Sequence, residues 1–173
     1  MTTPTASLEV WQRGPLPGFD PLLMPVAHSF RQVQEDLRAL VDQVSPETVW
    51  QCPGGAASIA FHVRHIGGST DRLLTYARGQ SLSDQQRAAA RAETDDSEPR
   101  PSLAELVDEA SAAIDRALDQ VRRLPRESLL EARTVGRAEL PSNTLGLLFH
   151  AAEHATRHAG QSVTMAKILA ASA

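Results

Sequence analysis

Five of the six histidines in this sequence fall into two clusters, and imidazole is the commonest metal-binding side chain in proteins. His62 and His65 form one cluster, and His150, His154 and His158 form the other. Residues four apart on an α-helix share a face, so His154 and His158 can direct their rings at one point. A histidine from the first cluster would complete three nitrogen donors between two helices. We therefore predict a divalent-metal site.

Spacing alone leaves the membership of this site open. At 100° per residue, His62 lies about 60° from the centre of its apolar stripe and His65 about 120° from it, which favours His62. Successive histidines of the second cluster are offset by about 40°, so only two adjacent ones share an ion comfortably. A further interpretation is that the histidines only form hydrogen bonds in the core and hold no metal.

Other groups capable of chemistry are weaker candidates. Cys52 is the only cysteine, which excludes an internal disulfide and a zinc site built from several cysteines. Because it lies in a loop with no evident base, we expect an inert thiol. Glu153 and Asp71 are expected to be solvated or salt-bridged. His28 has no neighbouring histidine, and we expect it to be hydrogen-bonded or partly exposed.

The composition is that of an ordinary soluble protein forming a single domain over residues 1–173. Apolar residues make up 42% and charged residues 22% of the chain. A net charge of −4 gives no broad positive surface for phosphate backbones, so we expect no nucleic-acid partner. No stretch reaches the roughly 18 apolar residues of a membrane span, and the start lacks the features of a signal peptide. We expect a cytoplasmic protein with no membrane partner.

Apolar residues recur at steps of three and four in four segments, which predicts four amphipathic helices. These segments span about 25–44, 59–77, 103–124 and 144–170. The abundance of Ala, Leu, Gln, Arg and Glu favours helix as well. We predict an all-α fold in which the four helices form one four-helix bundle.

Three stretches between or before these helices are predicted to be irregular. Residues 1–24 form a proline-rich N-terminal arm, and residues 125–141 precede the last helix. Residues 80–101 are polar and much longer than a usual bundle connection, which implies a crossover or a lid. Within it, the stretch from Gln85 to Glu93 could form a short helix whose apolar face consists of alanines.

Two motifs resemble a known family. The first is Ser58-Ile59-Ala60-Phe61-His62-Val63-Arg64-His65-Ile66, and the second is His150-Ala151-Ala152-Glu153-His154-Ala155-Thr156-Arg157-His158-Ala159-Gly160-Gln161. They are similar to the second and fourth helices of the DinB superfamily, which includes YfiT-like metal-dependent hydrolases and bacterial thiol S-transferases. The resemblance implies that His65, His154 and His158 are the metal ligands.

The resemblance also implies an up-down-down-up four-helix bundle, in which residues 80–101 supply the long link between the second and third helices. It further implies a homodimer and a zinc or nickel ion. His62 and His150 exceed the family's minimum set. Either is interpreted as a group behind the ligands, as a substitute ligand, or as a catalytic residue that shuttles a proton.

Three imidazoles on a divalent ion leave a coordination position open, which is typical of catalytic sites. Such an ion activates water or a small thiol as a nucleophile near neutral pH. We therefore predict a hydrolase or a thiol S-transferase that acts on a small-molecule substrate. The alternative is a non-catalytic, stress-associated dimeric scaffold that merely retains the metal. A pocket open to the ion would favour the enzyme, and a fourth protein ligand would favour the scaffold.

Overall fold

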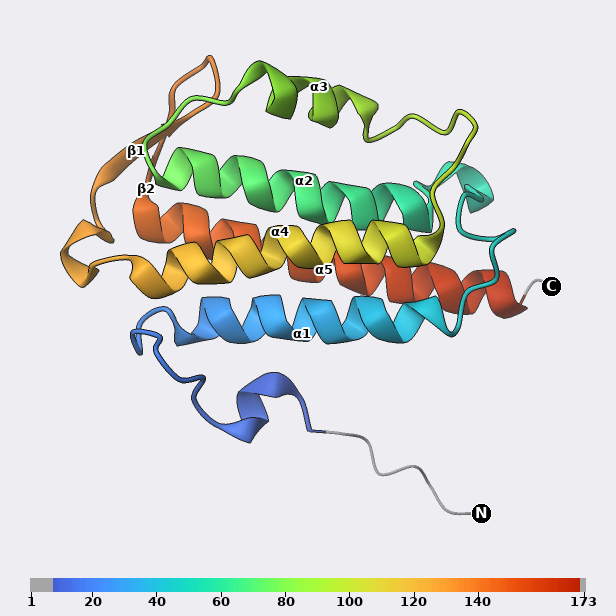
Figure 1. Cartoon of the computed structure of the whole chain (residues 1–173), viewed down its shortest axis with the longest axis horizontal. Helices are drawn as coiled ribbons and strands as arrows, with labels where there is room; N and C mark the ends of the chain where they lie inside the picture. The colour runs from blue at the N-terminus through green and yellow to red at the C-terminus, as the bar shows by residue number, and fades with distance from the viewer. Residues whose placement is uncertain (1–7, 172–173) are drawn as a thin grey trace.

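The computed structural model describes residues 8–171, and four long helices dominate it (Figure 1). α2 packs against both α4 and α5, and α1 packs against the same two helices. In Figure 1, α1 and α5 run in one direction, whereas α2 and α4 run in the other. The long helices are α1 (Met24–Val41), α2 (Ile59–Ala77), α4 (Leu103–Arg123) and α5 (Thr144–Ala171).

Caps explain where these helices begin and end. The hydroxyl of Ser58 accepts a hydrogen bond from the backbone N–H of Phe61 at the start of α2. Ser102 and Glu105 form a capping box at the start of α4. Gly79, with φ +72°, follows the end of α2, where a residue without Cβ adopts the left-handed conformation easily. The sequence predicted all three boundaries.

The first helix ends at Val41, three residues before the predicted end at Val44. The backbone N–H of Gln43 bonds to the carbonyl of Leu40, which tightens the last turn. Val44 still packs against the core, so its apolar spacing continued beyond the helix itself. The hydrophobic pattern therefore overestimated the length of α1.

The prediction of irregular structure over residues 125–141 was wrong. This stretch contains a short 3-10 helix, Arg126–Ser128, and strand β1, Ala132–Val135. β1 pairs antiparallel with β2, Leu140–Asn143, so the fold is mostly helical with a small two-stranded sheet. The strand sequences, Ala-Arg-Thr-Val and Leu-Pro-Ser-Asn, lack the strict alternation of apolar and polar residues that reveals a strand in a sequence.

Shorter helices occupy the other connections. Within the predicted N-terminal arm, residues 1–7 lie outside the described part of the chain, and Val10–Arg13 forms a 3-10 helix. A second 3-10 helix, Pro53–Gly55, precedes α2. The crossover between α2 and α4 contains α3, Asp84–Ala92, close to the short helix that the sequence allowed. Figure 1 shows α3 alongside α2.

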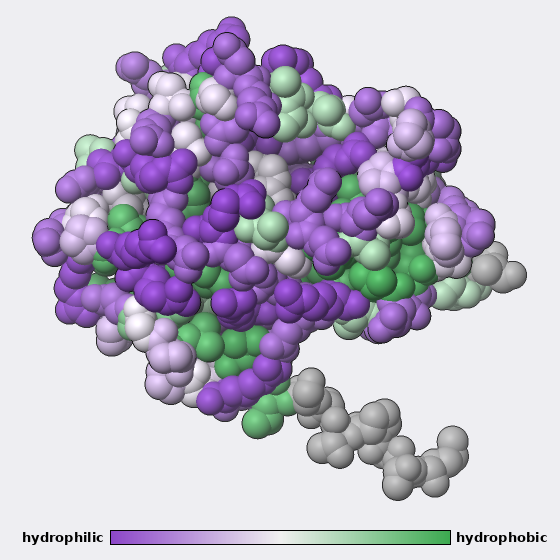
Figure 2. Space-filling model, viewed as in Figure 1, coloured by the Kyte–Doolittle hydropathy of each residue, from purple (hydrophilic) through white to green (hydrophobic). Residues whose placement is uncertain are grey.

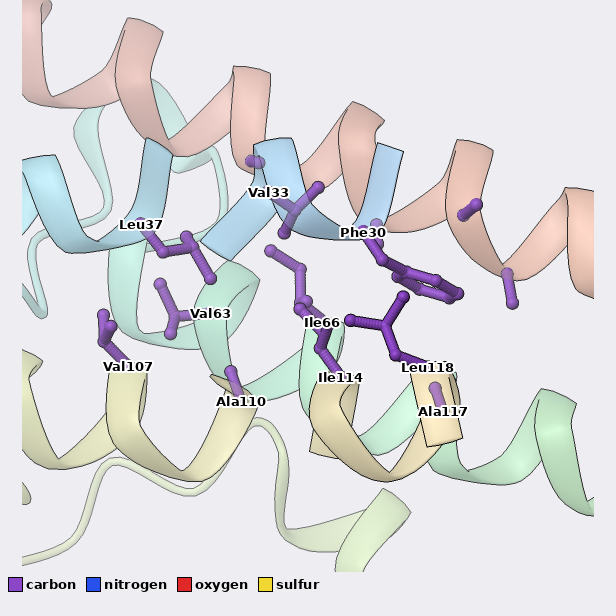
Figure 3. Close-up of a cluster of buried hydrophobic side chains, with 14 of the residues drawn as sticks. Phe30, Val33, Leu37, Val63, Ile66, Val107, Ala110, Ile114, Ala117 and Leu118 are labelled. Carbon is purple, nitrogen blue, oxygen red and sulfur yellow. The ribbon is translucent and has the colours of Figure 1, made fainter. Parts of the chain in front are cut away.

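The hydrophobic core lies between the four long helices. Close packing of apolar side chains there removes a large area from water, which is the main source of stability for such a fold. Figure 3 shows side chains of α1, α2 and α4 directed toward one another in this core. The fully buried members include Phe30, Leu37, Ile66, Ile114 and Leu118.

The outer surface is mainly polar. Hydrophilic residues cover most of the face seen in Figure 2, and hydrophobic residues show only in patches between them. No helix in the described part of the chain is both long and apolar enough to cross a membrane.

Candidate metal centre

Three histidines from two packed helices meet at one point. His65 projects from α2, and His154 and His158 project from α5. One ring nitrogen from each lies within 4.8 Å of the others. The ring centroids are 4.5 Å apart for His154 and His158, 4.6 Å for His65 and His158, and 5.0 Å for His65 and His154. The rings are steeply inclined to one another, so they surround a common space.

The hydrogen bonds indicate which nitrogens face this space. Nε2 of His65 lies 2.8 Å from Nε2 of His154. Nδ1 of His65 bonds instead to Oε2 of Glu93 at 2.6 Å, and Nδ1 of His158 bonds to Nδ1 of His62 at 2.9 Å. Nδ1 of His154 is buried and has no hydrogen-bond partner among the described residues. The outer nitrogens of His65 and His158 are thus engaged, and their Nε2 atoms remain for an ion.

The histidine electrostatics favour neutral rings. Burial lowers the pKa values of His62, His154 and His158, and the positive charge that His65 can carry lowers them further. The pKa of His158 falls to about 4. Neutral imidazole is the form that binds a metal, so the lowered pKa values leave His154 and His158 in the form that a ligand requires near pH 7.

The two further histidines of the sequence prediction occupy different positions. His62 is buried directly behind His158, to which it is hydrogen-bonded. His150 is exposed, and its ring lies 5.4 Å from that of His154. Its Nδ1 is 3.7 Å from a carboxylate oxygen of Glu153, which also pairs with Arg157. His62 therefore adjoins the cluster from inside, whereas His150 lies at its outer edge.

The weaker candidates lie in ordinary polar surroundings. The carboxylate of Asp71 accepts a hydrogen bond from Gln86, and His28 bonds through Nε2 to the carbonyl of Gly14. Cys52 is exposed, and its thiol makes only a long contact with the carbonyl of Trp50. None of these groups joins the three-histidine cluster.

Glu93 is the residue that the sequence analysis missed. It follows α3 directly and is 7% exposed, and its other carboxylate oxygen accepts a hydrogen bond from Arg72 at 2.6 Å. Burial raises the pKa of the Glu93 carboxyl, but the hydrogen bonds from His65 and Arg72 outweigh it and leave the pKa below its usual value. Glu93 is therefore an anion beside His65.

A glycine in α2 leaves room for this carboxylate. A Cβ on Gly68 would lie 2.3 Å from Oε1 of Glu93, closer than any real contact. Glycine within a helix costs about 1 kcal/mol relative to alanine, so an internal Gly67-Gly68 pair signals a close approach by another group. This pair was the available clue to Glu93.

A cavity of about 380 Å³ lies beside the cluster. Its walls include Phe61 and Glu93, both of which contact His65. The Phe61 ring stacks on the His65 ring, with an interplanar angle of 11° and centroids 5.4 Å apart. Trp50 forms another wall, and the guanidinium of Arg64 lies 5.0 Å from its ring centre. The cavity therefore borders the cluster through Phe61 and Glu93, and none of the three histidines is among its lining residues.

Fold and site together define a helical protein with a three-histidine centre between two helices. A family model for the DinB superfamily matches residues 29–162, well over half of the chain. The chain therefore belongs to the DinB superfamily, as its two motifs predicted. No curated protein sequence matches the chain.

Solved structures share this fold. A DinB-like protein from Bacillus cereus has a TM-score of 0.62 at 15% identity, over 84% of this chain and 91% of that chain. A DinB-like protein from Bacillus subtilis has a TM-score of 0.60 at 17% identity, over 84% and 92%. A conserved protein from Enterococcus faecalis has a TM-score of 0.59 at 13% identity, over 84% and 95%. At such identities, the likeness concerns the fold alone.

Proposed function

We propose that this chain is a metal-dependent enzyme of the DinB type, in which His65, His154 and His158 bind a divalent zinc or nickel ion. The observation that carries the proposal is the convergence of three ring nitrogens within 4.8 Å. Three imidazole nitrogens that converge in this way can all donate their lone pairs to one divalent ion. Imidazole suits zinc, nickel, copper and iron alike, so the choice of zinc or nickel rests on the family resemblance.

The surroundings of the three histidines favour a catalytic role over that of a non-catalytic scaffold. In the described part of the chain, no cysteine or carboxylate joins the three histidines as a fourth ligand. Three protein ligands leave a position for water or substrate, and the cavity walled by Phe61 and Glu93 would offer a small molecule space near the centre. A purely scaffolding site would instead be closed by a fourth protein ligand.

The protein's own residues would hold and support this centre. A bound divalent ion would supply the activation of water or of a small thiol, as in a hydrolase or a thiol S-transferase. His62 orients His158 through their shared hydrogen bond, and Glu93 orients His65. His150 is exposed at the outer edge, where it can exchange protons with solvent. Phe61 and Trp50 would pack against an apolar part of the substrate.

The finer architecture belongs to the same proposal. We propose that the four long helices form an up-down-down-up bundle, supported by the helix directions in Figure 1 and by the crossover that contains α3. We also propose one domain over residues 1–173 that acts as a cytoplasmic homodimer on a small molecule, without nucleic-acid or membrane partners.

Metal analysis of protein purified without a histidine tag tests the proposal. We expect about one equivalent of divalent metal per chain in the wild type and a large loss in His65→Ala, His154→Ala and His158→Ala. His28→Ala is the matched control, because His28 lies on α1 with its own bond to Gly14. Unchanged metal content in all three cluster variants would refute the site.

The class of reaction needs a second experiment. Metal-loaded protein would be assayed against model esters and amides, and against electrophiles in the presence of small thiols. Turnover by the wild type that is lost in His154→Ala would establish a metal-dependent enzyme. The assay that shows this turnover, with esters and amides or with thiols and electrophiles, would distinguish a hydrolase from a transferase. Full metal binding without turnover in either assay would favour the non-catalytic scaffold.

A further inference from the structure

The crossover between α2 and α4 reaches the core through one side chain. Among residues 78–102, Glu93 alone is buried, and the residues of α3 itself are exposed or half-buried. Other contacts of the crossover are polar and peripheral. Gln86 donates to Asp71 and Thr75, and the Arg64 guanidinium donates to backbone carbonyls of the crossover. The crossover is therefore held against the helices mainly by a carboxylate and not by apolar packing. We call this packed position of the crossover its seating.

That carboxylate ends on the histidine cluster. Its Oε2 lies 2.6 Å from Nδ1 of His65, the nitrogen opposite Nε2, and its Oε1 lies 2.6 Å from Arg72. An anionic acceptor at Nδ1 holds the proton there and leaves Nε2 as a free lone pair. Such a partner fixes the tautomer and the orientation of a ligand histidine and makes it more basic.

We propose that Glu93 is the positioning residue of the metal centre, and that through it metal binding and seating of the crossover are coupled. The inference rests on the proposed metal-binding function. If His65 held a metal ion, its Nδ1–H would be a stronger donor to Glu93, and this bond would stabilise the packed position of the crossover. Because coupling between two equilibria is reciprocal, loosening Glu93 must weaken metal binding.

The coupling reaches a second cavity. A space of about 480 Å³ lies between α3, α2 and α4, and Glu93 forms part of its wall together with Ala89 and Ala110. Metal binding at the histidines would therefore also stabilise the position of α3, which covers this cavity. A purely structural Glu93, held by Arg72 alone, would steady the crossover equally well with or without metal.

Two variants disturb Glu93 in different ways. Glu93→Gln removes the charge and keeps the shape. Gly68→Ala keeps the charge but places a Cβ 2.3 Å from Oε1 of Glu93 and 2.8 Å from Nη1 of Arg72, so the carboxylate and its Arg72 partner must shift. Alanine also favours helix by about 1 kcal/mol over glycine, so reduced metal binding in Gly68→Ala would not reflect a weaker helix.

Each variant has a matched control. Glu109→Gln removes a carboxylate from the wall of the same 480 Å³ cavity without touching a histidine. Gly160→Ala adds a Cβ within α5 that meets no atom within 4 Å. Both controls should behave as the wild type does.

The experiment measures zinc affinity by competition with a chelating dye, and hydrogen exchange of residues 84–96 with and without zinc. In the wild type we expect zinc to slow exchange in this segment. In Glu93→Gln and Gly68→Ala we expect zinc affinity to fall about tenfold to a hundredfold and the zinc-dependent protection to disappear.

The outcomes separate the two proposals. The inference would be overturned if Glu93→Gln and Gly68→Ala both bound zinc with wild-type affinity. It would also be overturned if hydrogen exchange of residues 84–96 in the wild type did not change with zinc. Neither result would contradict the proposed metal site. A wild-type protein that binds neither zinc nor nickel would overturn the proposed function and the inference with it.

Discussion

Nδ1 of His62 lies 2.9 Å from Nδ1 of His158, so the two histidines share one proton across the interface between α2 and α5. If Nε2 of His158 binds an ion, its Nδ1 carries that proton and donates it to His62. This arrangement makes His62 a partner of a ligand, which is one of the roles that the sequence left open for it. It also explains how a buried histidine is satisfied next to other histidines.

Replacing His62 should weaken the metal centre without abolishing it. In His62→Phe, Nδ1–H of His158 would lose its acceptor, and we expect metal affinity to fall about tenfold to a hundredfold. His62→Gln restores an acceptor oxygen and should recover part of the affinity. Titration with a chelating dye measures both variants against His158→Ala, which should lose binding altogether. Equal affinity in His62→Phe and wild type would show that His62 does not support His158.

The metal-free protein should lose stability as the pH falls from about 6.5 toward about 4. The pKa of His158 in the folded state is about 4, well below the usual histidine value of about 6.5, because the ring is buried near other histidines. Between these values the unfolded chain binds more protons than the folded one, so the free energy of unfolding rises with pH. The contribution of the unprotonated His158 ring to the free energy of unfolding is complete above about pH 6.5 and is lost below about pH 4.

Urea unfolding of chelator-treated protein at a series of pH values measures this effect. His158→Gln, which cannot be protonated at this position, is the control and should show a smaller dependence between pH 4 and 6.5. The same dependence in both proteins would assign the acid sensitivity to other groups, such as the carboxylates. His62 and His154, whose pKa values are also lowered, should contribute in the same direction.

The sequence predicted the long helices and the two histidine clusters because both depend on local spacing. Steps of three and four residues place apolar side chains on one face, and the spacing of His154 and His158 places their rings together. The choice of His65 depends on how α2 is rotated against α5, which periodicity describes only approximately. The motif resemblance supplied that choice, and the structure does place His65 in the cluster.

Glu93 and the hairpin were beyond local reasoning for physical reasons. Glu93 reaches His65 from a polar crossover 28 residues away, and nothing in that segment marks one carboxylate as buried. Strands β1 and β2 are only four residues long and carry no buried face. Their pairing follows from the turn that joins them and from contact with the helices, which a hydrophobic pattern does not record.

Gly67→Ala should destabilise the fold, in contrast to Gly160→Ala. A Cβ on Gly67 would lie 3.1 Å from the Cα of Ala110, so α2 and α4 would have to separate slightly. Overpacking of this kind costs about 1–3 kcal/mol, partly offset by about 1 kcal/mol of helix propensity. Gly160→Ala meets open space and should be neutral or stabilising. Thermal and urea unfolding compare the two, and equal stability would mean that α4 accommodates the methyl group freely.

His150→Ala should leave metal binding unchanged, because His150 is exposed and stands outside the group of three ring nitrogens. Its nearest charged partner is Glu153, at 3.7 Å, and loss of such an exposed contact costs little. We therefore expect wild-type metal content, wild-type zinc affinity and a stability change within about 0.5 kcal/mol. If His150 shuttles a proton, turnover of the metal-loaded protein should fall and its pH profile should change while affinity stays constant. A loss of metal in His150→Ala would instead make His150 a ligand and require the site to be redrawn with His150 and His154.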